Sequence, residues 1–150
     1  MNITFSQTRN IDLIEAIGNH PDNAAGSNNG DVFLYDPACV YIATFVDGDL
    51  AGIGYFKQVQ PSAIEIHAMI LNSHRKKGVK IARDFVRFLL ANSTFECFTS
   101  MAAEKFRHGQ LFCSLVGLRR VGTIERYFKG RDNVTIYAAT RYQLENFLGG

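Results

Sequence analysis

No stretch of this 150-residue sequence is apolar for long enough to cross a lipid bilayer, which takes about 18–20 apolar residues in a helix. The first segment, MNITFSQTRN, lacks the apolar centre of a secretory signal peptide. Cysteine is scarce as well. The chain has only Cys39, Cys97 and Cys113, which are widely spaced and form no CxxC pair. We therefore expect no membrane span, no disulfide framework and no cysteine-bound metal, and we expect a cytoplasmic protein with reduced thiols.

An excess of one charge is also missing. The formal net charge is +2 with histidine neutral, and charged residues make up 20% of the chain. Such a small net charge makes nucleic acid an unlikely partner, although positive residues gather at 74–87 and 119–131. The second group is typical of a solvated strand edge. Hydrophobic residues make up 47%, enough for the packed core of a single domain spanning 1–150.

What the sequence does contain is organised around residues 65–91. They predict a strand, a basic loop and a helix that starts near Val79. In the strand, the even-numbered positions are apolar. Glu65 and His67 stand at odd-numbered positions, so they project together from the other face. In the helix, apolar residues recur at i, i+4, i+7 and i+8 from Ile81, which indicates one buried side.

The basic loop is a candidate anion site. Arg75, Lys76 and Lys77 precede Gly78, which stands at the predicted start of the helix. The first amides of a helix lack intrahelical partners and the helix dipole favours negative charge there, so a phosphate is a fitting ligand. The alternative is a solvated basic turn that only connects a strand to a helix.

The rest of the chain predicts a sheet built mostly from hairpins. Three consecutive antiparallel strands precede the central helix, which excludes a doubly wound parallel fold in this half. Gly52 and Gly54 interrupt the second of these strands and mark a bulge or a close ligand. The further predicted elements are a strand at 3–5, a helix at 11–17, a loop at 20–30, strands at 40–46, 50–59, 95–99, 119–128 and 133–140, a helix at about 108–116 and a closing helical turn at 142–148.

Two segments resemble motifs of the GNAT superfamily of N-acetyltransferases. The segment 75–80 (RKKGVK) is similar to its acetyl-coenzyme A motif, which reads Arg or Gln, two residues, Gly, one residue, then Gly or Ala. Arg75 and Gly78 match this motif, whereas Lys80 departs from it. The segment 115–122 (LVGLRRVG) is similar to the family's leucine-glycine-phenylalanine segment, with Leu118 in place of phenylalanine. The order of elements also fits over about two-thirds of the chain.

This resemblance implies an α/β (α+β) fold with a mixed, mostly antiparallel central sheet, helices on both faces and a splayed pair of parallel strands. It implies acetyl-coenzyme A as cofactor, with pantetheine along the backbone near 69–71 and pyrophosphate at the basic loop. Lys80 would either cover the phosphate site or swing away from it. The implied cofactor-binding residues are Met69, Ile70, Leu71, Arg75, Lys76, Lys77, Gly78, Val79 and Lys80.

The catalytic candidates are Glu65, His67 and Cys113. Either of the first two is a candidate general base, and the alternative is a hydrogen-bonded pair on a half-exposed sheet. In the family a tyrosine often stands four residues before the glycine of the second motif and acts as general acid. Cys113 takes that place here and is either a proton donor or a core residue, with Tyr127 and Tyr137 as possible substitutes.

Two functions follow. The first is acetyl transfer to an amine acceptor, either a small molecule or a protein. The second is a non-catalytic GNAT-fold protein, because the chain also resembles small GNAT-like proteins of tailed bacteriophages, some of which are head-assembly or virion proteins. We expect a cytoplasmic protein in the first case and a virion-associated one in the second, with a homodimer or a virion protein as the candidate partner.

Overall fold

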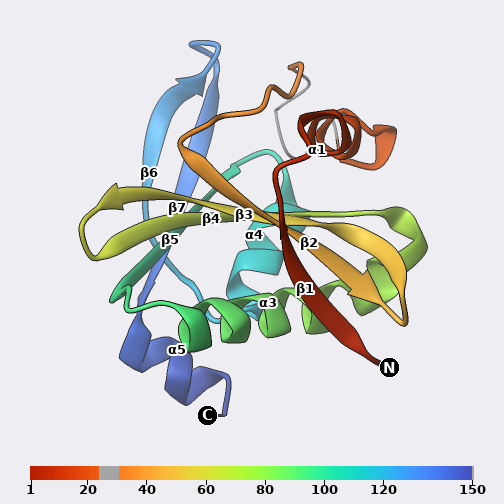
Figure 1. Ribbon diagram of the computed structural model, residues 1–150. Coiled ribbons are helices and arrows are strands. Elements are labelled where there is room, and N and C mark those ends of the chain that lie inside the picture. The colour runs from red at the N-terminus through yellow and green to blue at the C-terminus, as the bar shows by residue number, and fades with distance from the viewer. Residues whose placement is uncertain (24–30, 150) are drawn as a thin grey trace.

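A mixed β-sheet forms the centre of the computed structural model, which describes residues 1–23 and 31–149 (Figure 1). Within these residues the sheet has seven strands in the order β1-β2-β3-β4-β5-β7-β6. All neighbours are antiparallel except β4 and β5. The strands are β1 (Ile3–Thr8), β2 (Cys39–Val46), β3 (Asp49–Gln60), β4 (Ala63–Ile70), β5 (Cys97–Ala103), β6 (Arg119–Phe128) and β7 (Asp132–Thr140).

Helices cover both faces of the sheet, as Figure 1 shows. Helix α1 packs on one face, and α3, α4 and α5 pack on the other. A 3-10 helix, η1, leads directly into α3. The helices are α1 (Ile11–Gly18), η1 (Asn72–Lys77), α3 (Gly78–Asn92), α4 (Arg107–Leu115) and α5 (Arg141–Phe147). The fold class implied by the two motifs is therefore confirmed.

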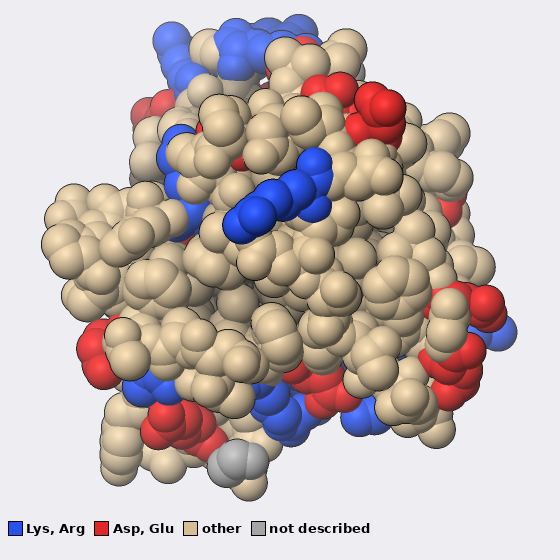
Figure 2. Space-filling model, viewed as in Figure 1, with Lys and Arg blue, Asp and Glu red and all other residues tan. Residues whose placement is uncertain are grey.

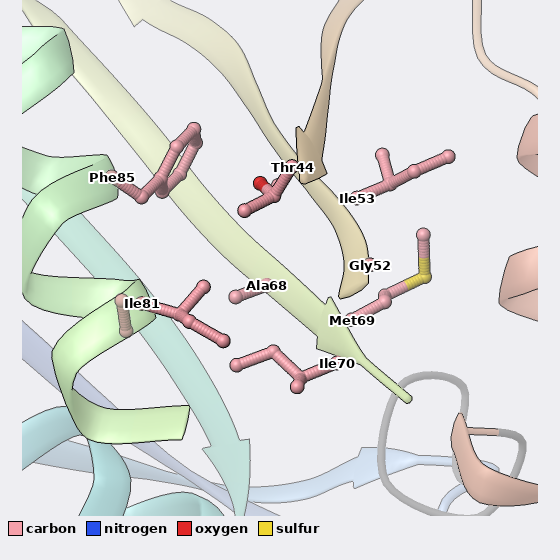
Figure 3. A pocket seen from close by; sticks show the side chains of 10 residues that line it. Thr44, Gly52, Ile53, Ala68, Met69, Ile70, Ile81 and Phe85 are labelled. Carbon is pink, nitrogen blue, oxygen red and sulfur yellow. The ribbon is translucent and has the colours of Figure 1, made fainter. Parts of the chain in front are cut away.

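Alternation along the strands creates a separate core on each face. Ile42, Ile64 and Ile66 pack with the apolar side of α3, and the core they form reaches α4 and α5. Tyr41 and Ile53 point the opposite way and pack with α1. Figure 3 shows the same division at close range: side chains of α3 approach one side of the sheet, while those of Ile53 and Met69 point away from it. The predicted opposite faces of the strand 63–70 are thus confirmed.

The two glycines of β3 lie against the protein's own atoms. A Cβ on Gly52 would lie 2.1 Å from the carbonyl oxygen of Met69, and one on Gly54 would lie 2.6 Å from the ring of Phe85. The register between β2 and β3 also shifts at Thr44, opposite these residues. Both glycines line a small cavity of about 10 Å³ beneath the sheet (Figure 3), which is room for roughly one water molecule. Gly52 therefore lies beside a bulge, and both glycines allow close packing of the protein's own atoms.

Several predicted boundaries shift by one to a few residues. β5 occupies Cys97–Ala103, later than the expected 95–99, because its pairing with β7 continues to Ala103. Helix α3 begins at Gly78, directly on η1, rather than at Val79. The later part of the expected loop 20–30, residues 24–30, lies outside the described residues. Among the described helices none is both long and apolar enough to cross a membrane.

Candidate functional site

The parallel strands β4 and β5 part soon after they meet. Their paired residues run only from Ala63 with Cys97 to Glu65 with Thr99. Beyond this point β4 continues alongside β3, and β5 continues alongside β7. We call this divergence the β4–β5 fork. Ala68 lies in the fork and is exposed to solvent, although it stands in the middle of β4 and is paired with Gly54 of β3. The fork thus leaves part of a central strand open.

Backbone groups of β4 point into the fork in an alternating pattern. The carbonyl of Ile66 accepts a hydrogen bond from the Ser100 hydroxyl at 2.8 Å, so it faces β5. The carbonyl of Ile70 also faces away from β3 and accepts from Arg75 at 3.0 Å. Leu71 does the reverse, because its amide donates to Ala51 of β3. Since strands repeat every two residues, the polar backbone groups of Ala68 also face the fork.

The basic loop is coiled as the 3-10 helix η1. The amide of His74 donates to the carbonyl of Leu71 at 3.0 Å, and the amide of Gly78 donates to that of Arg75. In a 3-10 helix each backbone amide donates a hydrogen bond to the carbonyl three residues earlier. Most backbone amides of this loop are therefore engaged within the loop itself, and an anion would be met first by side chains.

The exposed side chain of Arg75 connects the loop to two other segments. Its Nη2 donates to the carbonyl of Asp22 at 2.9 Å and to that of Ile70 at 3.0 Å. The Asp22 carboxylate in turn accepts from the backbone and side-chain nitrogens of Asn72, both at 2.8 Å. This network ties the start of η1 to the segment after α1 and to the end of β4. Arg75 was predicted as a cofactor ligand, and its role toward a cofactor stays a prediction.

The lysines of the loop differ in their surroundings. Lys76 and Lys77 are exposed and form no ion pair with a described residue. Lys80 turns along α3, where its Nζ lies 3.1 Å from the Asp84 carboxylate. Lys80 therefore does not cover the start of α3. At Gly78 a Cβ would lie 3.6 Å from Ile70 and in ordinary contact with its surroundings, so alanine would fit there.

Glu65 and His67 form a hydrogen-bonded pair on the face of the sheet that carries α1. His67 Nε2 and Glu65 Oε1 lie 2.6 Å apart, and each side chain is about a quarter exposed, at 27% and 24%. The hydrogen bond from His67 is the main cause that lowers the pKa of Glu65, against the opposing effect of burial. A carboxylate that accepts from Nε2 leaves Nδ1 of His67 as the acceptor nitrogen of a neutral ring. No described residue hydrogen-bonds to that nitrogen.

A row of aromatic rings continues from His67 across the sheet. The His67 ring stacks on Tyr55, with centroids 4.8 Å apart, and Tyr55 stacks on Tyr41 at 5.2 Å. Phe33 meets both tyrosine rings edge-on. Strand register produces this row, because Tyr41, Tyr55 and His67 are partners on adjacent strands. The rings form one wall of a cavity next to the Glu65–His67 pair.

This cavity, which we call the aromatic cavity, has a volume of about 260 Å³. It is lined by Phe33, Leu34, Asp36, Cys39, Tyr41, Tyr55, Lys57, Glu65 and His67. Lys57 stands directly opposite Glu65 in the register of β3 and β4, and its Nζ lies 3.4 Å from the Asp36 carboxylate. The amide of Ala38 donates to Asp36 at 2.9 Å and is the main cause that lowers the pKa of that carboxyl.

Cys113 lies on the other face, at the base of the fork. It is 7% exposed and packs in the core of α3, α4 and α5. Burial raises the pKa of its thiol, although the neighbouring Ser100 hydroxyl acts in the opposite direction. Since Ser100 also bonds the carbonyl of Ile66, the thiol is linked to the first backbone group beyond the paired part of β4 and β5. Whether Cys113 donates a proton stays a prediction.

The two tyrosines considered as substitutes lie away from the aromatic cavity. Tyr137 is buried on β7 near Ser114 and Arg120, and burial raises its pKa. Tyr127 is 48% exposed on the edge strand β6. Figure 2 shows basic side chains gathered where β6 and β7 turn, at the top of this view. One of them, Lys129, pairs with Asp31 at 2.9 Å. This basic group therefore covers an exposed edge strand, as its sequence indicates.

Sequence reasoning identified Glu65, His67 and the basic loop but missed the rest of the surroundings. Tyr55 and Lys57 reach the site through the pairing of β3 with β4, which the sequence alone does not give. Asp36 comes from a segment without regular structure, residues 31–38. Ala68 could have been noticed as a small residue in the middle of an otherwise bulky strand.

The chain has relatives of known sequence in bacteriophages. The sequence profile of the family described as "Protein of unknown function (DUF2824)" matches residues 3–149. Protein gp14 of Salmonella phage P22 is 52% identical over 146 residues, which is 97% of each chain. The resemblance to phage proteins is therefore confirmed.

Solved structures of acetyltransferases have the same fold. Spermidine N-acetyltransferase from Vibrio cholerae, in complex with CoA and spermine, matches with a TM-score of 0.79 and 10% identity, over 95% of this chain and 97% of that one. The acetyltransferase of GNAT family from Streptococcus pneumoniae matches with a TM-score of 0.69 and 11% identity, over 93% and 99%. At such identities the likeness establishes the fold. The chain has the GNAT fold and belongs to the DUF2824 family.

Proposed function

We propose that this protein is an N-acyltransferase that moves an acetyl group from acetyl-CoA directly to an amine. The observation that carries the proposal is the Glu65–His67 pair. It stands where β4 leaves β5, and it lines a cavity large enough for a small acceptor. A base beside a ligand-sized cavity and next to an open strand is what amine acylation requires.

The residues around the fork suit acetyl-CoA. Lys76 and Lys77 are exposed and can meet phosphate groups, and the fork-facing backbone of Ala68 offers hydrogen bonds to an amide-containing chain. Gly78 lies at the start of α3, between Ile70 at the end of β4 and Phe112 of α4. When bound, acetyl-CoA supplies a thioester whose carbonyl carbon an amine can attack.

We propose the following roles for the side chains, with the Nε2 proton of His67 on the nitrogen that faces Glu65. An acceptor enters as an ammonium ion and must lose a proton before its nitrogen can attack. The carboxylate of Glu65 holds the Nε2 proton of His67, so Nδ1 of His67 takes the proton from the ammonium. A nitrogen–carbon bond then forms and the carbon–sulfur bond breaks. The products are the amide, the free thiol of CoA and one proton released to solvent.

Cys113 is the proposed donor to the departing sulfur. Burial keeps its thiol protonated at neutral pH, which is the form that can give a proton. The thiol would recover its proton through the Ser100 hydroxyl that contacts it. In the mechanism Ser100 positions the thiol and does not itself meet the substrate.

The proposal is tested by measuring CoA release from acetyl-CoA in the presence of a panel of primary amines. We expect amine-dependent release by the wild type and a loss of about 10²–10⁴-fold in kcat for His67→Ala, the usual contribution of a general base. His108→Ala is the matched control, because His108 is exposed on α4, lies outside the cavity lining and is expected to keep wild-type rates. Equal rates in the wild type and His67→Ala would exclude the proposed base.

A non-catalytic role is the second candidate, and the coiled state of η1 favours it. The loop amides that would receive a pyrophosphate are engaged in 3-10 hydrogen bonds, and Arg75 is held by two carbonyls. A phage protein of this fold could then serve as a binding module for another virion protein. Absence of acetyl-CoA binding, together with capture of a defined virion protein, would favour this function.

A further inference from the structure

The aromatic cavity carries charges of both signs at separate places. Glu65 and His67 lie on β4, and Lys57 stands opposite Glu65 on β3, with Asp36 beyond it. Apolar and aromatic side chains cover the remaining wall. A ligand that satisfies all of these groups has an amine, an anion and an apolar part within a small volume.

Lys57 is available to bind an anion. Its contact with Asp36 is long, at 3.4 Å, and both side chains are exposed, at 49% and 41%. Such exposed pairs contribute little to stability. The negative charge of Asp36 depends less on Lys57 than on the amide of Ala38, whose hydrogen bond is the main cause that lowers the pKa of Asp36. Lys57 can therefore share its ammonium with a ligand carboxylate without leaving Asp36 unpaired.

The same arrangement disfavours a polycation. The spermidine N-acetyltransferase that shares this fold was solved with spermine, which carries several ammonium groups. Here the Glu65 carboxylate already accepts a hydrogen bond from His67, and Lys57 stands beside it on the neighbouring strand. A second ammonium near this pair would meet Lys57, the cross-strand partner of Glu65, and the two like charges would repel each other.

An apolar patch at the mouth indicates the third part of the ligand. Leu34 lines the cavity but is 71% exposed, whereas its neighbour Phe33 is 5% exposed. A ligand side chain that covers Leu34 would remove apolar surface from water. The cavity volume of about 260 Å³ is smaller than that of usual drug-sized sites, roughly 300–1,000 Å³, and suits one amino acid.

We infer that the acceptor is a zwitterion of amino-acid size with an apolar side chain, its amine at His67 and its carboxylate at Lys57. This inference rests on the proposed function for the reaction, but the binding it predicts does not need acetyl-CoA. Lys57 is then the residue that distinguishes a zwitterion from a simple amine of the same shape.

The experiment compares three probes that differ at one position: free leucine, leucinamide and 3-methylbutylamine. Binding of each is measured by calorimetry in the absence of acetyl-CoA, and acetylation of each, with spermidine added to the panel, is measured by CoA release. We expect leucine to bind and react best. In Lys57→Gln its affinity should fall about tenfold, as for loss of one partly exposed charged contact, while that of 3-methylbutylamine stays within about twofold.

Two further variants sharpen the result. Lys57→Glu should reverse the order, so that 3-methylbutylamine binds better than leucine. Lys105→Gln is the matched control, because Lys105 also pairs with an aspartate, at 2.8 Å, but lies outside the cavity. The inference is overturned if leucine and 3-methylbutylamine respond alike to Lys57→Gln, if none of the probes binds, or if spermidine reacts best. Leucine binding without any acetylation would sustain the zwitterion site at Lys57 and count against the proposed function.

Discussion

Replacing Glu65 by glutamine tests the central pair without changing its shape. The carboxylate accepts a 2.6 Å hydrogen bond from His67, and both side chains are about three-quarters buried. A hydrogen bond to a charged group contributes about 1.5–3 kcal/mol and a neutral one about 0.5–1.5 kcal/mol, so Glu65→Gln should cost about 1 kcal/mol at pH 7. For a chain of this length that corresponds to a fall in Tm of about 2–4 °C.

The stability cost of Glu65→Gln should depend on pH. The folded-state pKa of Glu65 is lowered, so its contribution is fully present above the pKa of the unfolded chain, about 4.3. The contribution is lost as pH falls through the folded-state value. The difference in unfolding free energy between wild type and Glu65→Gln should therefore shrink below about pH 4.

Urea unfolding at pH 7 and at pH 3.5 measures this difference directly. Glu145→Gln is the matched control, since Glu145 is 50% exposed and pairs with Arg141 at 3.3 Å, so its removal should cost less than about 0.5 kcal/mol. A cost of Glu65→Gln that stays the same at both pH values, or that equals the control, would refute the charged hydrogen bond as described.

The remaining predictions concern the neighbouring packing and the loop. Gly54→Ala should destabilise the fold by about 1–3 kcal/mol in thermal unfolding, because its Cβ would lie 2.6 Å from Phe85; adding Phe85→Leu should recover part of this loss, and simple addition of the two costs would contradict it. Lys80→Ala should leave acetyl-CoA affinity within about twofold in calorimetry, since Lys80 pairs with Asp84 along the helix, and a larger loss would show that Lys80 turns back to the ligand.

The sequence predicted the parts of this site that depend on local periodicity. Alternation along 63–70 placed Glu65 and His67 on one face, and the glycine at 117, with φ of 103°, ends the turn after α4 where expected. The fork was implied by the two GNAT-like motifs. All of these signals lie within a few residues of the feature they predict.

What the sequence did not predict depends on contacts between distant segments. No local pattern indicated that the guanidinium of Arg75 contacts the carbonyl of Asp22, 53 residues earlier in the chain. Lys57 reaches Glu65 only through a strand register that shifts at Gln58. The aromatic cavity needs the segment around Phe33 to fold over β2 and β3, and no local pattern marks it.

Binding of acetyl-CoA is the central claim, and a calorimetric titration of the protein with acetyl-CoA at low and high salt measures it. We expect one-to-one binding in the micromolar range that weakens with salt, because Lys76 and Lys77 supply exposed charges. The double variant Lys76→Glu, Lys77→Glu should bind at least about tenfold more weakly, as like charges replace two favourable ones. No binding by the wild type at millimolar acetyl-CoA, with the protein folded, would contradict an acyltransferase and leave the fold as a binding module.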